Sequence, residues 1–447
     1  MSTAQRQEFE SVLSGWGRVP VVQGAELRSE DLARLTEDLP LTRGLGRAYG
    51  DAALPAPSDR LVAGTTLADR ILSFDPETAV LTAEAGLSLD ELCRVFLPRG
   101  FFTPVSPGTR FVTLGGMVAC DVHGKNHHRE GTLGSHVLSL TIRTGTGDVV
   151  RCSAKEHDDL FRATIGGMGL TGAILDVTLR LVRVPSTSIL EECERVHDID
   201  QSLDALKSAS ARWPMTAGWI DCLASGRHLG RGVVFRGRWA EPHEVPPSPR
   251  SQPRNLTVPF DIPGWVLTEP AVRVFNALIY WRYRARHPSA IVHPYTFLYP
   301  LDAVAHWTRL YGSRGFTQYQ CVLPDSSGRE AVARFLTVLT RRGGASFLTV
   351  IKDCGAEGIG LLSFPRPGIS IAVDLPMRRH NTQSLVDALN EVVIAEGGRV
   401  YLAKDALTRP EHFRAMEPRL DAFLAVRRKW DPERRIRSAQ SVRLFGW

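Results

Sequence analysis

At 447 residues, with 43% apolar and 23% charged residues, the chain is too long for one ordinary core and too apolar for disorder, so at least two folded domains are expected. The formal net charge of +6 is mild; it suits an anionic substrate or an acidic membrane surface, and equally an ordinary globular protein. No apolar run approaches about 18 residues and no signal peptide is read at the start. Seven single cysteines without a CxxC pair argue against a disulfide framework and a structural zinc site, and favour a reducing, cytoplasmic location.

The first 180 or so residues predict an α+β region with many strands. Short apolar runs alternate with Gly-rich turns, as in "RLVAGTT", "AVLTAEAG", "LSLTIRTGTGDVV" and "GAILDVTLRLVRV". Between them, "LSLDELCRVFLPRG" at 87–100 predicts a helix that Ser88 or Asp90 caps and Gly100 ends. Its apolar side chains share one helical face: Leu89, Leu92, Val95 and Phe96.

The second half of the chain predicts a separate, mixed domain. Residues 240–264, rich in Pro and polar residues, predict a long surface loop or flap. An amphipathic stretch follows, and then the strand-like pieces "GFTQYQCVLP", "ASFLTVIKD" and "GISIAVDLP", with helices near 328–342 and 382–396. We expect an antiparallel sheet with helices on one side, and a largely helical end to the chain.

Three glycine-rich segments lie in the N-terminal half. They are "TRGLGRAYGDA" at 42–52, "SPGTRFVTLGGMVACDVHGKNHH" at 106–128 and "TIGGMGLTGAI" at 164–174. None is a Walker A loop, and each one alone is typical of a tight turn between strands. Successive amide groups in such loops can bind an anion, so three of them in one domain favour a large, dinucleotide-sized anionic ligand.

Clustered histidines and a basic stretch raise two other possibilities. His123, His127 and His128 lack the acidic partner and the HExxH pattern of a helical zinc site, and Lys125 between them favours an anion over a cation, so no metal is expected. "YWRYRARH" at 280–287 is the only basic run with interleaved aromatics, and a helix with a solvated basic face explains it equally well. A flavin-free protein that binds anionic ligands, nucleic acid included, ranks well below the other hypotheses, and no nucleic-acid partner is expected.

Several of these motifs together resemble one family. "RGLGRAYGD", "PGTRFVTLGGMVACDVHGKNHH", "GGMGLTG", "QYQCVLP", "VYLAKD" and "VRRKWDP" are similar, in this order, to the decaprenylphosphoryl-β-D-ribose 2′-oxidases, from about residue 14 to about residue 440. "CDVHGKNHH" is the most specific piece. The resemblance implies an α+β, two-domain FAD-binding fold of the vanillyl-alcohol-oxidase or PCMH type. Its FAD domain would comprise 1–183 and 398–447, and the inserted substrate domain 184–397.

The resemblance also implies the cofactor and its contacts. The flavin contacts fall on Arg43, Gly44, Leu45, Gly46, Arg47, Ala48, Tyr49, Gly50 and Asp51 in the first loop, and on Gly108, Thr113, Leu114, Gly115, Gly116, Cys120, Asp121, Val122, His123, Ile174 and Tyr401 elsewhere. Relatives that attach FAD covalently use a histidine in the first loop, which this loop lacks, so non-covalent FAD is expected.

For the chemistry, the resemblance implies Lys404 and His123 as catalytic residues. An ammonium at position 404 would hold the sugar hydroxyl or, with a lowered pKa, act as the base. Lys125 would face a phosphate or sugar hydroxyl. The positions implied to line the sugar pocket are Tyr49, Lys125, Trp219, Gln318, Gln320, Lys352, Ala372 and Lys404.

Three departures from the family pattern bear on the substrate. Ala372 stands where the family has the cysteine attacked by covalent nitroaromatic inhibitors, so covalent trapping should be lost while sugar oxidation stays possible. Leu298 and Tyr299 replace an aromatic residue and a histidine, and "IRSAQS" lacks an acidic residue after the serine.

The leading hypothesis is FAD-dependent oxidation of a furanosyl hydroxyl, C2′ of a phosphoprenyl ribose, to the keto sugar, as the first half of an epimerisation to arabinose. An NAD(P)H-dependent short-chain keto-reductase would be the partner, and a peripheral contact with the inner membrane face would present the lipid. The alternative is a flavin enzyme for a soluble sugar, nucleoside or aminosugar of a secondary-metabolite pathway. Both readings stay open on the sequence.

Overall fold

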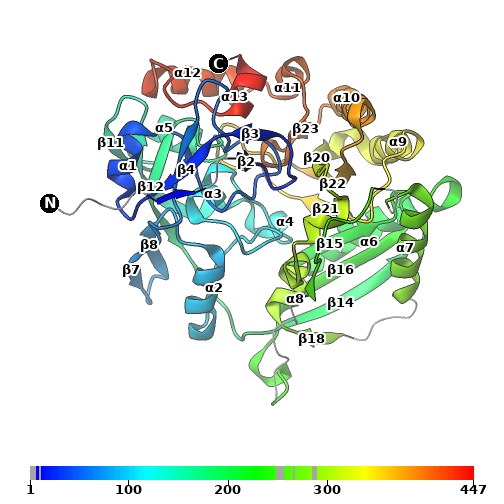
Figure 1. Ribbon diagram of the computed structural model, residues 1–447. Coiled ribbons are helices and arrows are strands. Elements are labelled where there is room, and N and C mark those ends of the chain that lie inside the picture. Colours follow the sequence, from blue (N-terminus) through cyan, green and yellow to red (C-terminus); the bar gives the residue numbers. More distant parts are fainter. Residues whose placement is uncertain (1–6, 10–11, 248–255, 265–266, 284–288, 447) are drawn as a thin grey trace.

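The computed structural model describes residues 7–9, 12–247, 256–264, 267–283 and 289–446. Two bodies of structure lie side by side: sheets and short helices from the first 183 residues, and one large sheet with long helices from the middle of the chain (Figure 1). About a third of the Pro-rich stretch (248–255 within 240–264) and half of the basic run (284–287 within 280–287) lie outside the described residues.

The N-terminal half contains two principal sheets. A four-stranded sheet has the order β1-β4-β6-β5, and a five-stranded antiparallel sheet has the order β11-β10-β12-β8-β7. The strands of the first are β1 (Gln7–Phe9), β4 (Ala25–Arg28), β5 (Thr42–Arg43) and β6 (Leu61–Gly64). Those of the second are β7 (Ile71–Asp75), β8 (Val80–Glu84), β10 (Val137–Thr144), β11 (Val149–Cys152) and β12 (Gly172–Arg180).

The helix expected at 87–100 is present as α2 (Leu89–Phe96). Ser88 caps it by accepting a hydrogen bond from the N–H of Glu91, and Gly100 ends the following turn with a φ of 79°. The other helices of this half are α1 (Leu32–Asp38), α3 (Leu114–Ala119), α4 (His127–Glu130) and α5 (Asp158–Thr164).

An eight-stranded sheet, with the order β18-β14-β16-β15-β21-β22-β20-β23, forms the second body. All of its neighbouring strands pair antiparallel, as expected for this domain. Its strands are β14 (Ile189–Val196), β15 (Met215–Ile220), β16 (Gly232–Trp239), β18 (Ala290–Val292), β20 (Phe316–Pro324), β21 (Thr349–Cys354), β22 (Gly368–Pro376) and β23 (Arg399–Val400).

The two faces of this sheet differ in chemistry. One face is apolar and packs in the main core with α6 (Ile199–Arg212), α9 (Gly328–Arg341) and α10 (Arg379–Ala395). The other face carries polar side chains on its central strands. Over β15 and β16 this second face is covered by α7 (Glu269–Arg282), whose Tyr280 packs with Trp219 and Val233. Helices therefore lie on both sides of the sheet, so the expectation of helices on one side is wrong.

The C-terminal helices return to the N-terminal half (Figure 1). They are α11 (Pro410–Met416), α12 (Leu420–Trp430) and α13 (Ala439–Phe445). Lys429 of α12 forms an ion pair of 2.7 Å with Asp159 of α5, and Arg443 of α13 pairs with Asp51. The end of the chain therefore closes around the first glycine-rich loop.

The remaining elements are short. Three two-stranded sheets pair β2 (Val12–Ser14) with β3 (Val21–Gln23), β9 (Phe101–Phe102) with β13 (Val182–Arg183) and β17 (Leu256–Thr257) with β19 (Val304–Ala305); one further helix is α8 (Pro294–Leu298). Within the described ranges, no helix is both long and apolar enough to span a bilayer. All seven cysteines are free thiols.

Candidate active site

The first glycine-rich loop, residues 44–48, presents unused backbone donors. Within the part of the chain that the structure describes, the N–H groups of residues 44 to 48 meet no acceptor. Successive free amides form a concave donor set for an anion such as a pyrophosphate. Two arginine side chains hold the loop in place: Arg43 donates to the Ser14 carbonyl at 2.9 Å, and Arg47 donates to the Phe111 carbonyl at 3.0 Å. The loop thus fits the diphosphate of FAD through its main chain.

The far end of this loop is tied to the C-terminal segment. Gly50 passes so close to that segment that a Cβ would lie 2.0 Å from the Asp405 carbonyl oxygen, which explains the need for glycine. Asp51 is buried, and its carboxylate accepts two hydrogen bonds from Arg443. The same guanidinium reaches Asp405 at 2.8 Å. The carboxylate of Asp51 therefore fixes the loop, and the flavin contact expected at Asp51 stays a prediction.

The second glycine-rich segment begins α3. Thr113 caps the helix by accepting from the N–H of Gly116 at 3.3 Å. Gly115 packs on Ala85, so that a Cβ would approach the Ala85 Cβ to 2.9 Å, while a Cβ at Gly108 would meet nothing within 4 Å. Leu114, Val122 and Ile174 are buried in the hydrophobic core of this half, so their side chains contribute packing beneath the loop.

Residues 120–123 lie beside the C-terminal segment. The hydroxyl of Tyr401 donates to the carbonyl oxygen of Cys120 at 2.9 Å, and the Tyr401 ring stacks on Phe364 with ring centres 4.8 Å apart. His123 lies against both rings, with centres 5.5 and 5.6 Å away. Burial and neighbouring lysines hold the pKa of His123 well below its usual value, so this histidine is neutral.

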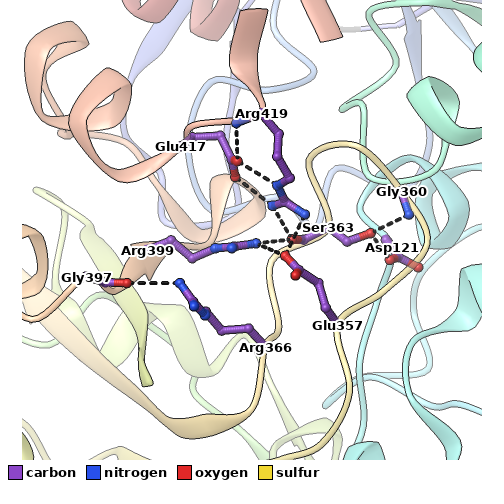
Figure 2. Close-up of polar contacts among 9 residues, drawn as sticks. All are labelled: Asp121, Glu357, Gly360, Ser363, Arg366, Gly397, Arg399, Glu417 and Arg419. Carbon is purple, nitrogen blue, oxygen red and sulfur yellow. Dashed lines mark hydrogen bonds and ion pairs between the residues drawn. The ribbon is translucent and has the colours of Figure 1, made fainter. Parts of the chain in front are cut away.

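A loop of the middle segment fixes the turn at Asp121, which has a φ of 41° (Figure 2). Asp121 accepts hydrogen bonds from the Ser363 hydroxyl and from the N–H of Gly134. Around Ser363, Figure 2 shows two arginines converging on its carbonyl oxygen: Arg399 at 3.2 Å and Arg419 at 2.9 Å. Both oxygens of the Asp121 carboxylate accept hydrogen bonds from the protein itself, so at this turn the backbone rather than this side chain is available to a ligand.

The polar face of the eight-stranded sheet brings together the side chains predicted to line the sugar pocket. Strand register places Gln320 opposite Ala372, Ala372 opposite Val350 and Val350 opposite Trp219. Directly paired residues point to the same face of a sheet, so these residues form one row. The same register rule puts Gln318 and Lys352 on this face. Lys404 and Tyr49 reach it from the C-terminal segment and the first loop.

Lys404 lies over the first loop. Its ammonium is 4.0 Å from the centre of the Tyr49 ring, and it has no hydrogen-bond acceptor among the described residues. Burial lowers the pKa of Lys404 to about 7; the charge of Asp374 raises it and that of Lys352 lowers it further. A lysine with this pKa exists in both protonation states near neutral pH.

The other predicted polar residues differ in whether their side chains have hydrogen-bond partners within the protein. Gln320 contacts His123 through their side-chain nitrogens at 3.1 Å and donates to the Ser370 hydroxyl at 3.1 Å. Burial lowers the pKa of Lys352, whose ammonium has no acceptor within the described ranges. Lys125 donates to the Phe297 carbonyl and lies over the Phe297 ring, and burial lowers its pKa to about 8. Trp219 donates to the Phe347 carbonyl at 3.0 Å, with its ring in the packing under α7.

Two residues of the site, Asp374 and Tyr311, were not predicted from the sequence. Asp374 is fully buried on β22 and accepts hydrogen bonds from Gln318 at 2.5 Å and from Tyr311 at 2.8 Å. Burial raises the pKa of Asp374 to about 6. The available signal was the carboxylate itself, which interrupts an otherwise apolar strand, "GISIAVDLP".

The departures at 298 and 299 lie in the core. Leu298 and Tyr299 are both buried, and the Tyr299 hydroxyl forms a 2.5 Å hydrogen bond with the Ser106 hydroxyl. Among the described residues, no group of three or more His, Cys, Asp or Glu side chains is placed to hold a metal ion. His127 and His128 instead bond separately, to the Gly355 N–H and the Trp213 carbonyl.

Comparison with known proteins agrees with this arrangement. Residues 33–153 match a family model described as an FAD binding domain, which contains the free-amide loop and the α3 segment. A decaprenylphosphoryl-β-D-ribose oxidase of Mycolicibacterium smegmatis is 35% identical over 99% of both chains. An uncharacterized protein of Streptomyces coelicolor is 34% identical over 77% of this chain and 96% of its own. A mitochondrial D-lactate dehydrogenase (cytochrome) of Arabidopsis thaliana is 31% identical over 31% of this chain and 25% of its own.

The D-lactate dehydrogenase match covers a fraction of the chain comparable to that of the FAD binding domain alone, whereas the oxidase match runs through both bodies of structure. The two-domain α+β architecture, the FAD binding domain and the full-length similarity agree: the chain belongs to the decaprenylphosphoryl-β-D-ribose oxidase family.

Proposed function

We propose that this protein is an FAD-dependent oxidoreductase that oxidises the C2′ hydroxyl of a decaprenylphosphoryl-ribose-like sugar to the ketone. The product would then be reduced to the arabinose epimer by a separate NAD(P)H-dependent short-chain reductase. One observation carries the proposal: Lys404, whose pKa is lowered, lies 4.0 Å over Tyr49 beside the loop with free amides. Among the described residues its ammonium has no acceptor, and neither has that of Lys352 on the adjoining sheet face.

The residues present fit FAD held without a covalent bond. The free N–H groups of residues 44 to 48 would hold the diphosphate, and the segment from Cys120 to His123, with Tyr401, would lie along the ring system. The loop contains no histidine for covalent attachment. When bound, FAD supplies the acceptor for the hydride that leaves the carbinol carbon.

The chain's own residues would orient the sugar and move the proton. Gln318, Gln320 and Lys352 lie on one sheet face and offer donors to sugar hydroxyls or the phosphate. Lys404 in its neutral form would take the hydroxyl proton, since its pKa of about 7 matches the task of a general base near neutral pH. His123, neutral and bonded to Gln320, would set the orientation of that amide.

A membrane-bound substrate is supported by the outer side of α7. Val274, Phe275, Leu278 and Trp281 are exposed there, Leu278 at 66% and Trp281 at 51%. Exposed aromatic and aliphatic side chains on one helix mark an interaction surface, and tryptophan favours the membrane interface. The inner side of the same helix packs on Trp219, in the row that would line the sugar site. We therefore propose peripheral attachment to the inner membrane face from the cytoplasm.

The proposed division of labour follows the two bodies of structure. Residues 1–183 and 398–447 would bind FAD and residues 184–397 would bind the sugar, with Lys404 supplied by the C-terminal segment. β23 (Arg399–Val400) crosses the later boundary, because it pairs with β20 of the large sheet. This pairing delivers Lys404 from the sheet edge to the first loop.

A second candidate is a soluble sugar, nucleoside or aminosugar as substrate. Ala372 favours it, because the sheet face has a small apolar side chain where the family has a reactive cysteine.

The deciding experiment is an absorption spectrum of the purified protein before and after denaturation, followed by anaerobic addition of phosphoribosyl lipid and of soluble pentofuranosides. We expect flavin that is released on denaturation and is bleached by the lipid-linked sugar. Bleaching by soluble sugars alone would establish the second candidate. Protein that takes up no FAD on reconstitution would overturn both.

A further inference from the structure

Asp374 is a buried carboxylate that no cation neutralises directly. It accepts hydrogen bonds from the Gln318 amide at 2.5 Å and the Tyr311 hydroxyl at 2.8 Å, both of them neutral donors. Among the described residues, no Lys, Arg or His nitrogen makes a hydrogen bond or ion pair with it, although the charge of Lys404 lowers its pKa. Burying such a group is unfavourable unless it interacts with a nearby charge, so its presence on the sugar-binding face calls for a role.

One donor to Asp374 is held rigidly. The ring of Tyr311 stacks on Phe316, with centres 4.1 Å apart and planes 14° apart, and on Phe347 at 5.0 Å. Phe316 in turn meets the edge of Tyr49 at 5.5 Å. This aromatic cluster leaves the Tyr311 hydroxyl little freedom, so one oxygen of Asp374 has a fixed position.

The other donor connects Asp374 to Lys404. The amide nitrogen of Gln318 lies 2.5 Å from Asp374 and 3.4 Å from the Tyr49 hydroxyl, and the Lys404 ammonium lies over that same Tyr49 ring at 4.0 Å. The path from carboxylate to ammonium is therefore a short series of side-chain contacts across β22, β20 and the first loop.

The charges that face Lys404 are few. Asp374 on β22 and the Cys120 thiol raise its pKa, while Lys352 on β21 lowers it. Around Asp374, the groups in contact are Gln318 and Tyr311, and the charge of Lys404 lowers its pKa. Asp374 thus supplies a negative charge that raises the pKa of Lys404, and His123, whose own pKa the charge of Lys404 lowers, is a further titratable neighbour.

We propose that Asp374 is a positioning residue of the oxidation: its carboxylate fixes the Gln318 amide on the sugar-binding face and its charge controls how readily Lys404 releases a proton. This inference rests on the proposed role of Lys404 in sugar oxidation.

The direction of the effect follows from the charges. Above pH 6 Asp374 is mostly ionised, since its pKa is about 6, and a negative charge favours the protonated form of a nearby lysine. Removing the charge in Asp374→Asn keeps the shape and an acceptor for the Tyr311 hydroxyl, but lowers the pKa of Lys404 from about 7. The shift expected from an opposite charge at short range is on the order of one pH unit.

The test measures Lys404 directly. FAD-loaded protein with ¹³Cε-labelled lysine is titrated by NMR, and the Lys404 signal is assigned by its loss in Lys404→Arg. We expect the Lys404 midpoint to fall by roughly one pH unit in Asp374→Asn and by less in Tyr311→Phe, which removes one donor to Asp374. Asp353→Asn is the matched control: it changes a buried carboxylate of β21 that pairs with Lys207 at 2.6 Å, and the midpoint should not move.

Each outcome decides. An unchanged midpoint in Asp374→Asn and Tyr311→Phe, or an equal fall in Asp353→Asn, overturns the proposal. If Asp374→Asn fails to fold, Tyr311→Phe alone decides by the same criterion. Failure of the proposed function is distinguished from failure of this inference, because the titration needs no substrate: a protein whose flavin no sugar reduces would still show whether Asp374 controls Lys404.

Discussion

Arg443, in the last helix, binds both carboxylate oxygens of Asp51 at 2.8 Å and at the same time reaches Asp405 at 2.8 Å. One guanidinium therefore joins the end of the chain to the first glycine-rich loop and to the residue that follows Lys404. The planar fork of arginine suits this bidentate contact and a lysine would not reproduce it.

Replacing Arg443 should destabilise the protein and weaken FAD binding together. Arg443→Ala leaves two largely buried carboxylates, Asp51 and Asp405, without their cation, and we expect the free energy of unfolding to fall by about 3 kcal/mol. Urea unfolding and flavin-fluorescence titration measure the two effects. Arg437→Ala, which breaks the half-exposed pair with Asp59, should cost less than about 1 kcal/mol. Equal losses in the two variants would contradict the role given to Arg443.

The rate of flavin reduction by the sugar should rise as the pH passes through about 7, because the neutral form of Lys404 takes the hydroxyl proton. Below that pH the lysine is protonated and has no lone pair to offer. Lys404→Ala should reduce the rate on the order of 10²- to 10⁴-fold while FAD stays bound. Anaerobic stopped-flow absorbance across pH 5.5 to 9 gives both results. A rate that falls through about pH 7 would show instead that the charged lysine clamps the hydroxyl.

Local signals were sufficient to predict the elements around the site. Ser88 and Gly100 mark the ends of α2 because a cap and a left-handed glycine act within one turn. The family resemblance predicts Gln318, Gln320 and Lys352 as residues of the sugar pocket. Strand register places all three on one face of the sheet.

What the sequence could not supply are contacts between distant segments. Tyr311 and Asp374 are 63 positions apart, Ser363 and Asp121 are 242 apart, and Arg443 and Asp51 are 392 apart. Each of these pairs joins polar side chains, and the sequence around a polar residue does not distinguish a buried partner from an exposed residue. Only the closure of the C-terminal helices onto the first loop, and the packing of a middle loop against Asp121, turn them into buried partners.

A thiol at position 372 should be reactive from the sugar site. Ala372 is partly exposed and lies between Gln320 and Val350 on the polar sheet face, so Ala372→Cys places a sulfur there without crowding the core. With sugar substrate present to reduce the flavin, and the flavin in turn to reduce the nitro group to a thiol-reactive nitroso group, we expect a nitroaromatic inhibitor of the family to modify the variant covalently. Mass spectrometry of the tryptic peptide would show this adduct, and the parent protein should stay unmodified at this strand. An unmodified variant that still oxidises sugar would mean that residue 372 faces away from the inhibitor.

Charges on the outer side of α7 should release the protein from membranes without harming the flavin site. Val274 and Leu278 are exposed one helical turn apart, whereas Tyr280 packs under the helix, so Val274→Glu with Leu278→Glu leaves the inner contacts intact. Losing two apolar anchors should weaken co-sedimentation with anionic vesicles by roughly tenfold or more. Leu72→Glu is the control: Leu72 on β7 is an aliphatic side chain at 48% exposure, and this variant should bind as before.

Turnover of a lipid-linked sugar in vesicles should fall with vesicle binding, while reduction of the flavin by a short-chain analogue in solution stays unchanged. If both variants sediment like the parent, α7 does not hold the protein at the bilayer, and the soluble-sugar alternative gains the stronger position.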